Sequence, residues 1–262
     1  MSTPSVIWLA GFHAVEAALR HDPTRIDALW LLAGRQDQRS QKLRQLAQAA
    51  GIPPEEQPEK AFTEQIRRNP DLARHQGVLA RYTPQPAGDE HTLDQLLDTL
   101  TEPALLLVLD GVTDPHNLGA CLRSAEAAGA HAVITPKDRA AGLTPAARKA
   151  ASGAAERLPF IQVTNLARTL SELKTRGLWI VGAAGGGLVS LYDTDFAAEP
   201  VALVMGSEGE GLRRLTQERC DQLITIPMRA PVESLNVSVA SAICLFEFRR
   251  VRDSLSAAAR IG

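Results

Sequence analysis

The chain has 262 residues, enough for two domains or one large one, and its composition of 45% hydrophobic but only 4% aromatic residues predicts an aliphatic core. The formal net charge of −2 excludes a protein that binds polyanions through bulk charge alone. Residues 1–82 carry 11 Lys and Arg against 9 Asp and Glu, a net of +2, whereas the remainder carries 17 against 21, a net of −4. The first part is therefore the better candidate for a nucleic-acid surface.

The three cysteines, Cys121, Cys220 and Cys244, are odd in number and widely spaced, and they form no metal-binding pattern. We expect buried thiols in a reducing compartment. The first residues show neither the basic region nor the apolar core of a secretory signal. Since no run of about eighteen apolar residues occurs either, we expect a soluble cytoplasmic protein without metal or membrane contact.

Residues 1–82 alternate strand-like and helix-like segments and predict a small α/β domain. Expected strands cover 6–9, 26–32 and 78–82, and expected helices cover 13–20 and 41–50. The stretch TPQPAGDEH (83–91) is rich in Pro, Gly and charge, so we place a linker at 83–95.

The second predicted domain covers 96–262, and strands alternate with helices along it. Expected strands cover 104–109, 132–134, 160–163, 179–183, 201–205 and 223–226. Expected helices cover 93–99, 117–128, 145–151, 166–175, 211–219 and 237–248. The alternation predicts a parallel sheet with helices on both faces, and the continuous apolar run ALLLVL at 104–109 fits a strand buried on both sides.

Ligands of open α/β sheets bind at the carboxyl ends of strands, so the loops after the expected strands are the candidate sites. The first loop, DGVTDPHNLGACLR (110–123), contains Asn117 and Arg123. The competing interpretation makes Asn117 a helix cap and Arg123 a solvated charge.

The second loop, GSEGEGL (206–212), has three glycines that permit positive φ and free its backbone N–H groups. Its glycine order reverses the dinucleotide-binding fingerprint, and no Gly-Lys-Ser/Thr follows. Glu208 would repel a phosphate and suits a cationic or hydroxyl-bearing partner. A simple tight turn is the alternative.

The third loop brings Ile226, Met228, Ser234, Leu235 and Asn236 in front of an apolar helix. Apolar backbone beside a few polar groups suits a flat heteroaromatic ring such as adenine. The alternative makes Ser234 the N-cap of the helix and Asn236 a helix-start residue.

Three segments occur in a fixed order: NLGACLRSAEAAG (117–129), VMGSEGEGL (204–212), and IPM with SLNVSVA (226–228 and 234–240). They resemble the three motifs of the SpoU, or TrmH-type, branch of the SPOUT family of RNA ribose methyltransferases. HAVITPKDR (131–139) and VTNLART (163–169) are most similar to the branch members that methylate a guanosine of 23S rRNA. GFHAVEAAL (11–19) and HQGV (75–78) resemble the L30e-like substrate-binding domain of such enzymes. The resemblance covers nearly the whole chain.

The resemblance implies a parallel SPOUT sheet with a C-terminal deep trefoil knot, an S-adenosyl-L-methionine cofactor and a homodimer. By motif position, the implied catalytic residues are Asn117, Arg123, Glu208, Ser234 and Asn236. The implied cofactor-binding residues are Ala183, Met205, Gly206, Gly211, Ile226, Met228 and Leu235. The loop at 182–190 is a glycine-rich variant of a stretch that varies in the family, and the segment RAPVE at 229–233 is an insert.

The implied reaction is methyl transfer to a ribose 2′-OH of large-subunit rRNA, in the P-loop of the peptidyl-transferase centre. The family's candidate for activating the hydroxyl is Arg123, but a guanidinium stays protonated at neutral pH and is therefore a poor base. Arg123 is better suited to orient the hydroxyl or to stabilise developing oxyanion character, held by Asn117 and Glu208.

Three alternatives stay open at this point. The first is the same chemistry on a tRNA or on another rRNA site. The second is a non-catalytic RNA-binding ribosome-assembly factor, which the joint presence of the five polar residues disfavours. The third is a Rossmann-type methyltransferase, which would need its glycine-rich loop after the first strand rather than after a late one.

Overall fold

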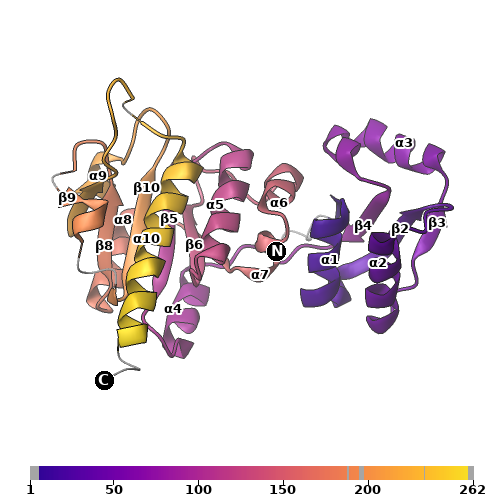
Figure 1. The fold of residues 1–262 in the computed structure, drawn as a ribbon, viewed down its shortest axis with the longest axis horizontal. Coiled ribbons are helices and arrows are strands. Elements are labelled where there is room, and N and C mark those ends of the chain that lie inside the picture. Colours follow the sequence, from indigo (N-terminus) through magenta and orange to yellow (C-terminus); the bar gives the residue numbers. More distant parts are fainter. Residues whose placement is uncertain (1–5, 188, 195–197, 233, 259–262) are drawn as a thin grey trace.

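The computed structural model describes residues 6–187, 189–194, 198–232 and 234–258, so Leu188 and Glu233 of the two variable stretches lie outside the described residues. The chain forms two lobes side by side along its long axis, each built around its own sheet (Figure 1). The predicted α/β class is confirmed. No described helix is long and apolar enough to span a bilayer.

The N-terminal lobe contains a four-stranded sheet in the order β1-β4-β2-β3. The strands are β1 (Ile7–Ala10), β2 (Ile26–Leu32), β3 (Glu55–Gln57) and β4 (Val78–Tyr82), and β4 runs antiparallel to β1 and β2. The helices are α1 (Phe12–His21), α2 (Gln38–Ala49) and α3 (Glu59–Arg68). One apolar cluster forms under α1 and α2, and a second forms around Phe62 of α3. The sequence did not predict β3 or α3, because few apolar residues mark them.

The C-terminal lobe contains a seven-stranded parallel sheet in the order β7-β6-β5-β10-β8-β11-β9, which confirms the predicted parallel arrangement. Its strands are β5 (Leu105–Asp110), β6 (Ala132–Pro136), β7 (Phe160–Val163), β8 (Trp179–Ala183), β9 (Val189–Ser190), β10 (Val201–Gly206) and β11 (Gln222–Thr225). All six residues of β5 are buried, as expected for a strand covered on both faces.

Alternate side chains of β5 enter two different apolar clusters, so helices cover both faces of the sheet. One face carries α5 (Pro115–Ala127), α6 (Pro145–Ala151), α7 (Ala154–Arg157) and α10 (Val237–Ala258). The other carries α4 (Glu90–Thr99), α8 (Leu166–Thr175) and the single turn α9 (Arg214–Gln217). The loops after β10 and β11 project from the upper edge in Figure 1.

Helices α4, α9 and α10 are among those whose limits differ from the expected ones. α4 begins at Glu90, because Asp89 and Thr92 form a capping box there. α9 is much shorter than 211–219, since the backbone at Gly209 and Gly211 has positive φ and delays the helix. α10 continues ten residues past Phe248. The trefoil knot and the predicted domain limits stay predictions.

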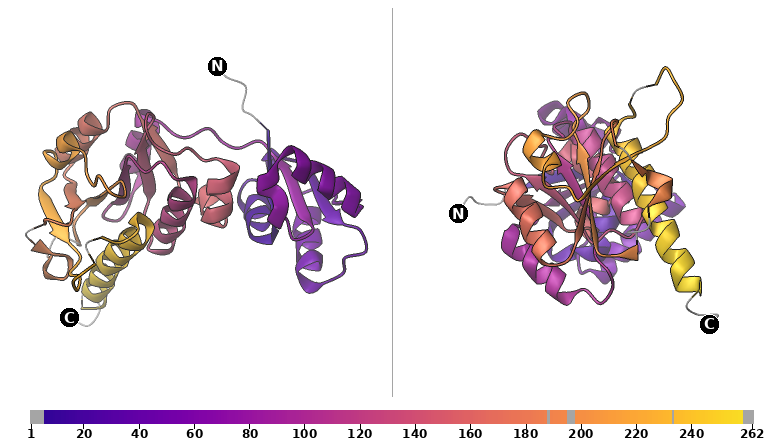
Figure 2. Two further views of the ribbon diagram at one scale, coloured as in Figure 1. Left: turned by 90° about the horizontal axis from the view of Figure 1, so that it is seen from above. Right: turned by 90° about the vertical axis from the view of Figure 1, so that its left-hand side faces the viewer.

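The two lobes touch through more than the connecting segment. α6 and α7 lie against the N-terminal lobe in the left view of Figure 2. Arg148 of α6 pairs with Glu156 of α7 at 2.8 Å, both side chains being nearly inaccessible, and its guanidinium lies 5.8 Å from the centre of the Tyr82 ring. Lys149 Nζ donates to the carbonyl oxygen of Asp71 at 2.9 Å. The polar contacts therefore hold the lobes in a defined orientation.

Gly119 allows α5 and α6 to pack closely. A Cβ added there would lie 2.3 Å from the Ala147 carbonyl oxygen and 2.5 Å from Ala150 Cβ. We predict that Gly119→Ala lowers the free energy of unfolding by about 1–3 kcal/mol through overpacking, although Ala is the better helix former. Urea denaturation measures the change. Gly142→Ala is the matched control, because its Cβ would meet no described atom within 4 Å. Equal stability of the two variants would contradict the close-packing argument.

Candidate active site

The carboxyl ends of β8, β10 and β11 border a cavity of about 500 Å³. Strand-end loops and the first turn of α10 form its walls. The lining residues are Ala183, Ala184, Gly185, Met205, Gly206, Ser207, Glu208, Gly209, Glu210, Gly211, Ile224, Thr225, Ile226, Met228, Ser234, Leu235, Val237 and Ala240. This is the place where ligands of open α/β sheets bind.

The loop after β10 folds back on itself to make one wall of the cavity. Ser207 and Gly211 exchange two backbone hydrogen bonds, at 3.1 and 3.0 Å. A Cβ on Gly206 would lie 2.1 Å from the carbonyl carbon of Gly211, so only glycine permits this approach. The glycines thus bring backbone rather than side chains to the cavity, as their spacing in the sequence suggested.

The ionisable groups among the described lining residues are two carboxylates, Glu208 and Glu210, and no Lys, Arg or His accompanies them. The remaining wall combines apolar side chains such as Met205 and Ile226 with small residues and backbone. Carboxylates repel phosphate and attract a cation, so the cavity suits a partly apolar ligand with positive charge or hydroxyl groups.

Three loops meet at the side chain of Asn236. Its Nδ2 donates to Asn117 Oδ1 at 3.0 Å and to Glu208 Oε2 at 3.4 Å. Its Oδ1 accepts from the backbone N–H of Ser238 at 2.9 Å and from the Ser238 hydroxyl at 2.6 Å. Donors on one side and acceptors on the other fix the orientation of the amide. We call Asn117, Glu208 and Asn236 the polar centre.

Asn236 also caps α10, because its side chain accepts the N–H of Ser238 in the first turn. The alternative interpretation of the third loop as a helix cap was therefore partly right, but the capping residue is Asn236 and not Ser234. Ser234, proposed there as the N-cap, is exposed and lines the cavity instead.

The structure does not bring Arg123 to the polar centre. Arg123 lies on the exposed side of α5, and it has no hydrogen bond or ion pair to any described residue. Six residues along a helix separate Arg123 from Asn117 by about 120° in direction and about 9 Å in height. Within one chain Arg123 therefore points away from Asn117.

The seven residues assigned to cofactor binding all line the cavity. Sequence reasoning missed other lining positions, including Ala184, Gly185, Ser207, Thr225 and Ala240. Ser207 lies inside the second motif, Thr225 directly precedes the third, and Ala184 and Gly185 follow the assigned Ala183. Ala240 is the last residue of the third motif, and it reaches the cavity one helical turn after Asn236. The described residues contain no group of three His, Cys, Asp or Glu that could hold a metal ion.

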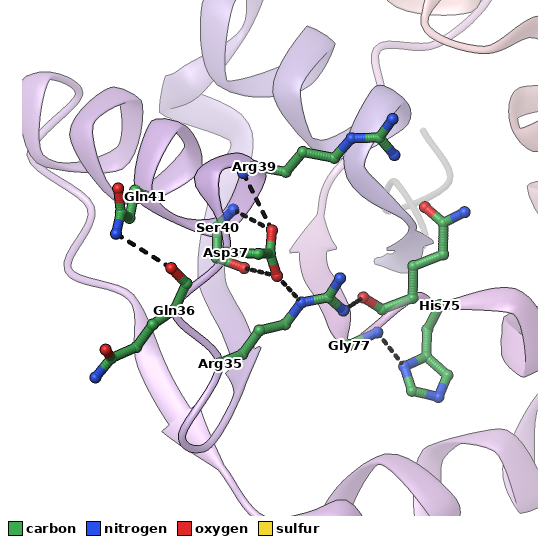
Figure 3. Close-up of polar contacts among 9 residues, drawn as sticks. Arg35, Gln36, Asp37, Arg39, Ser40, Gln41, His75 and Gly77 are labelled. Atoms are coloured by element: carbon green, nitrogen blue, oxygen red, sulfur yellow. Dashed lines mark hydrogen bonds and ion pairs between the residues drawn. The ribbon is translucent and has the colours of Figure 1, made fainter.

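The N-terminal lobe carries a cluster of four basic residues, Arg35, Arg39, Lys42 and Arg44. Three of their side chains already bind groups of the same lobe. Arg35 binds Asp37 and the carbonyl oxygen of Gln76, and it holds the pKa of Asp37 at about 2 (Figure 3). Lys42 pairs with Glu16 at 2.7 Å, and Arg44 pairs with Glu56 at 2.8 Å. Among the described residues, only the Arg39 guanidinium in this cluster lacks a partner.

His75 stabilises the loop that Arg35 holds. Its ring stacks on Phe62 with centres 4.8 Å apart, and its Nδ1 accepts the N–H of Gly77 at 2.9 Å (Figure 3). This hydrogen bond needs an unprotonated Nδ1. Burial lowers the pKa of His75; Glu59 opposes this with a smaller effect, and the neighbouring Arg35 lowers the pKa further.

Comparison with known proteins agrees with this architecture. Residues 104–246 match the model of the SpoU rRNA Methylase family, and residues 8–87 match that of RNA 2'-O ribose methyltransferase substrate binding. The 23S rRNA (guanosine-2'-O-)-methyltransferase RlmB of Ralstonia nicotianae is 55% identical over 95% of this chain and 97% of its own. The protein of the same name from Pseudomonas syringae pv. tomato is 53% identical over 93% and 95%.

Solved structures give the same picture. The SpoU methyltransferase AviRb from Streptomyces viridochromogenes, in complex with the cofactor AdoMet, superposes with a TM-score of 0.76 at 25% identity. The match covers 95% of this chain and 91% of that one. A crystal structure of an RNA 2'-O ribose methyltransferase superposes with a TM-score of 0.74 at 27% identity, over 95% and 90%.

The lowered pKa of His75 predicts an acid-sensitive N-terminal lobe. The unfolded chain takes up a proton near the ordinary histidine pKa of about 6.5, whereas the folded chain resists it. The stabilisation that unprotonated His75 provides is therefore fully present above the pKa of the unfolded chain, and it is lost as the pH falls through the lower pKa of the folded chain. Urea denaturation at about pH 7.5 and about pH 5.5 measures the effect. His75→Phe keeps the ring packing but cannot titrate, so an undiminished pH dependence in this variant would refute the assignment.

Proposed function

The chain belongs to the SpoU rRNA methylase family, and we propose that it transfers a methyl group from S-adenosylmethionine to the ribose 2′-OH of a guanosine in 23S rRNA. The family assignment from the three motifs is thereby confirmed. High identity to RlmB proteins over nearly the whole chain supports the substrate. The position of the guanosine in the peptidyl-transferase-centre P-loop stays a prediction from the resemblance.

The observation that carries this proposal is the polar centre at the cofactor cavity. The residues present fit S-adenosylmethionine: apolar side chains and backbone suit the adenine, and Glu208 and Glu210 favour a cationic sulfonium over a phosphate. When bound, the cofactor supplies an electrophilic methyl group. A polar centre with two amides and a carboxylate can then orient an incoming hydroxyl.

The protein's own chemical task is to align the 2′-OH and to handle its proton. Asn236 holds one oxygen of the Glu208 carboxylate, while Oε1 has no partner among the described residues. That oxygen can accept a hydrogen bond from the ribose or from a guanidinium. Arg123 cannot act as a base near neutral pH, so its role is to orient the hydroxyl and to stabilise negative charge that develops on it.

The structure supports a homodimer in which Arg123 acts across the interface. Val239 and Phe246 on α10 are 49% and 50% exposed, which is costly for a face that stays in water. This face continues over α5, where Arg123 lies one helical turn before Ala127, a residue that shares a hollow with Phe246. A two-fold interface here would bring Arg123 of the partner subunit toward the polar centre.

The other readings have less support. Methylation of a tRNA would use the same chemistry, but the high sequence identity of this chain is to methyltransferases named for 23S rRNA. A non-catalytic assembly factor would have no need for an oriented polar centre beside a cofactor-sized cavity. We also propose a cytoplasmic location, since the relatives are named for a modification of ribosomal RNA.

The function is tested by methyl transfer in vitro. We expect the protein to incorporate a labelled methyl group into 23S rRNA from a strain that lacks the enzyme, at one guanosine whose 3′-linkage then resists alkaline cleavage. Asn236→Ala should lower turnover by about 100-fold or more, because it removes a group that positions the reacting atoms. Methylation of tRNA instead of 23S rRNA, or of a base instead of a ribose, would refute the proposal. 23S rRNA from the parent strain is the control, since its site is already filled.

Subunit mixing tests the composite site. Arg123→Ala and Asn236→Ala homodimers should each be nearly inactive. If the two groups come from different chains, each heterodimer has one doubly damaged site and one intact site. Random exchange then makes about half the dimers heterodimers and restores about a quarter of the sites. No recovery, with exchange shown by mass spectrometry, would place both groups in one chain.

A further inference from the structure

Cations occur along the carboxyl edge of the large sheet, beside the cofactor cavity. Lys137 and Arg139 follow β6, and Arg213 follows the loop after β10; all three are exposed. One acid, Asp138, lies exposed between the first two. We call Lys137, Arg139 and Arg213 the cationic edge. Neither the polar centre nor the cavity lining contains any of them.

A buried carboxylate fixes Arg213. The Asp110 side chain, at the end of β5, is fully inaccessible. Its Oδ2 accepts the backbone N–H of Arg213 at 3.0 Å, and its Oδ1 lies 3.4 Å from Arg213 Nε. The guanidinium then lies against Gly111, whose added Cβ would be 3.2 Å from Nη2. Its outer nitrogens have no other partner among the described residues, and the side chain is 40% exposed.

Arg139 is held in a different way. Its backbone has a φ of 58°, a left-handed conformation that non-glycine residues rarely adopt. Two residues later, the N–H of Ala141 donates to the carbonyl oxygen of Val112 at 2.8 Å, which ties the loop after β6 to the loop after β5. Within the described chain, the Arg139 guanidinium has no hydrogen bond or ion pair. Such local backbone strain often accompanies a functional position.

The position of the cationic edge connects the two lobes. In the sheet order, β6 and β5 precede the strands β10, β8 and β11 that border the cofactor cavity. The N-terminal lobe lies on the β6 side of the sheet in Figure 1 and contacts α6 and α7. An RNA strand that reaches from that lobe to the polar centre must therefore cross the carboxyl ends of β6 and β5.

We propose that the cationic edge binds the phosphodiester backbone of the substrate RNA between the part held by the N-terminal lobe and the methylated ribose. This inference rests on the proposed function. Arg213 is the positioned member, because Asp110 aligns its fork while two nitrogens stay available for a phosphate. Lys137 and Arg139 extend the contact toward the lobe. The contacts position the RNA without reading its sequence.

Charge removal at single positions tests the proposal. Arg139→Gln and Arg213→Gln each should weaken the affinity for a 23S rRNA fragment about three- to tenfold, and each should lower the slope of log K against log salt by roughly 0.7–1. The turnover number at saturating RNA and the calorimetric affinity for S-adenosylmethionine should stay unchanged. Arg213→Lys should recover part of the affinity, because the charge remains and the fork is lost.

Arg219→Gln is the matched control. Arg219 is likewise exposed and makes no side-chain hydrogen bond or ion pair with the described residues, but it lies after α9 at the opposite, amino end of β11. Its loss should change neither affinity nor salt slope. Should Arg213→Gln fail to fold, Arg139→Gln carries the test, because its side chain has no described partner to lose.

Two results would overturn the proposal. In the first, both variants bind the fragment like Arg219→Gln, with the same salt slope. In the second, Arg213→Gln weakens cofactor binding as much as RNA binding and Arg139→Gln changes nothing, so that Arg213 serves only to hold its loop. Failure of the proposed function is separate: the unaltered protein would then not methylate the fragment at all.

Discussion

The geometry of the site depends on one amide, that of Asn236. The same side chain satisfies the first turn of α10 and orients Asn117 and Glu208, so the helix cannot begin elsewhere without dispersing the polar centre. α10 in turn packs on α5, where Cys121 Sγ lies 3.7 Å from the Ser241 hydroxyl, and α5 carries Asn117. Secondary-structure capping and site assembly are thus one interaction, and a partly buried amide is costly to leave unpaired.

The sequence predicted the elements whose signals are local. The limits of β2, β4, β7 and β8 agree with the expected strands, because apolar runs bounded by turn residues mark them. The predicted helix at 211–219 shrank to one turn, since a propensity argument does not see that Gly209 and Gly211 extend the preceding loop. The segment from 55 to 68 lacked a strong apolar pattern and was missed.

The candidate site divides along the same line. The motifs located the cavity wall, because each motif is a continuous stretch that follows a strand. Loop spacing could not tell that Asn117, Glu208 and Asn236 meet while Arg123 points away, since that depends on which face of α5 each side chain occupies. Asp110 and Arg213 escaped notice for another reason: they are 103 residues apart, and only the parallel pairing of β5 with β10 brings them together.

The distribution of charge explains how two ligands of opposite sign can be bound side by side. Glu208 and Glu210 make the cofactor cavity attractive to a cation and repel phosphate. Among the described residues, the buried Asp110 is the one acid that pairs with the cationic edge. At physiological salt, such interactions between exposed charges are screened beyond about 8 Å. The buried ion pair of Arg148 and Glu156 holds α6 and α7 where the N-terminal lobe contacts them, although its two charges are costly to desolvate. In the proposed complex, this arrangement would present an RNA held by the N-terminal lobe to the cationic edge, and its ribose to the polar centre.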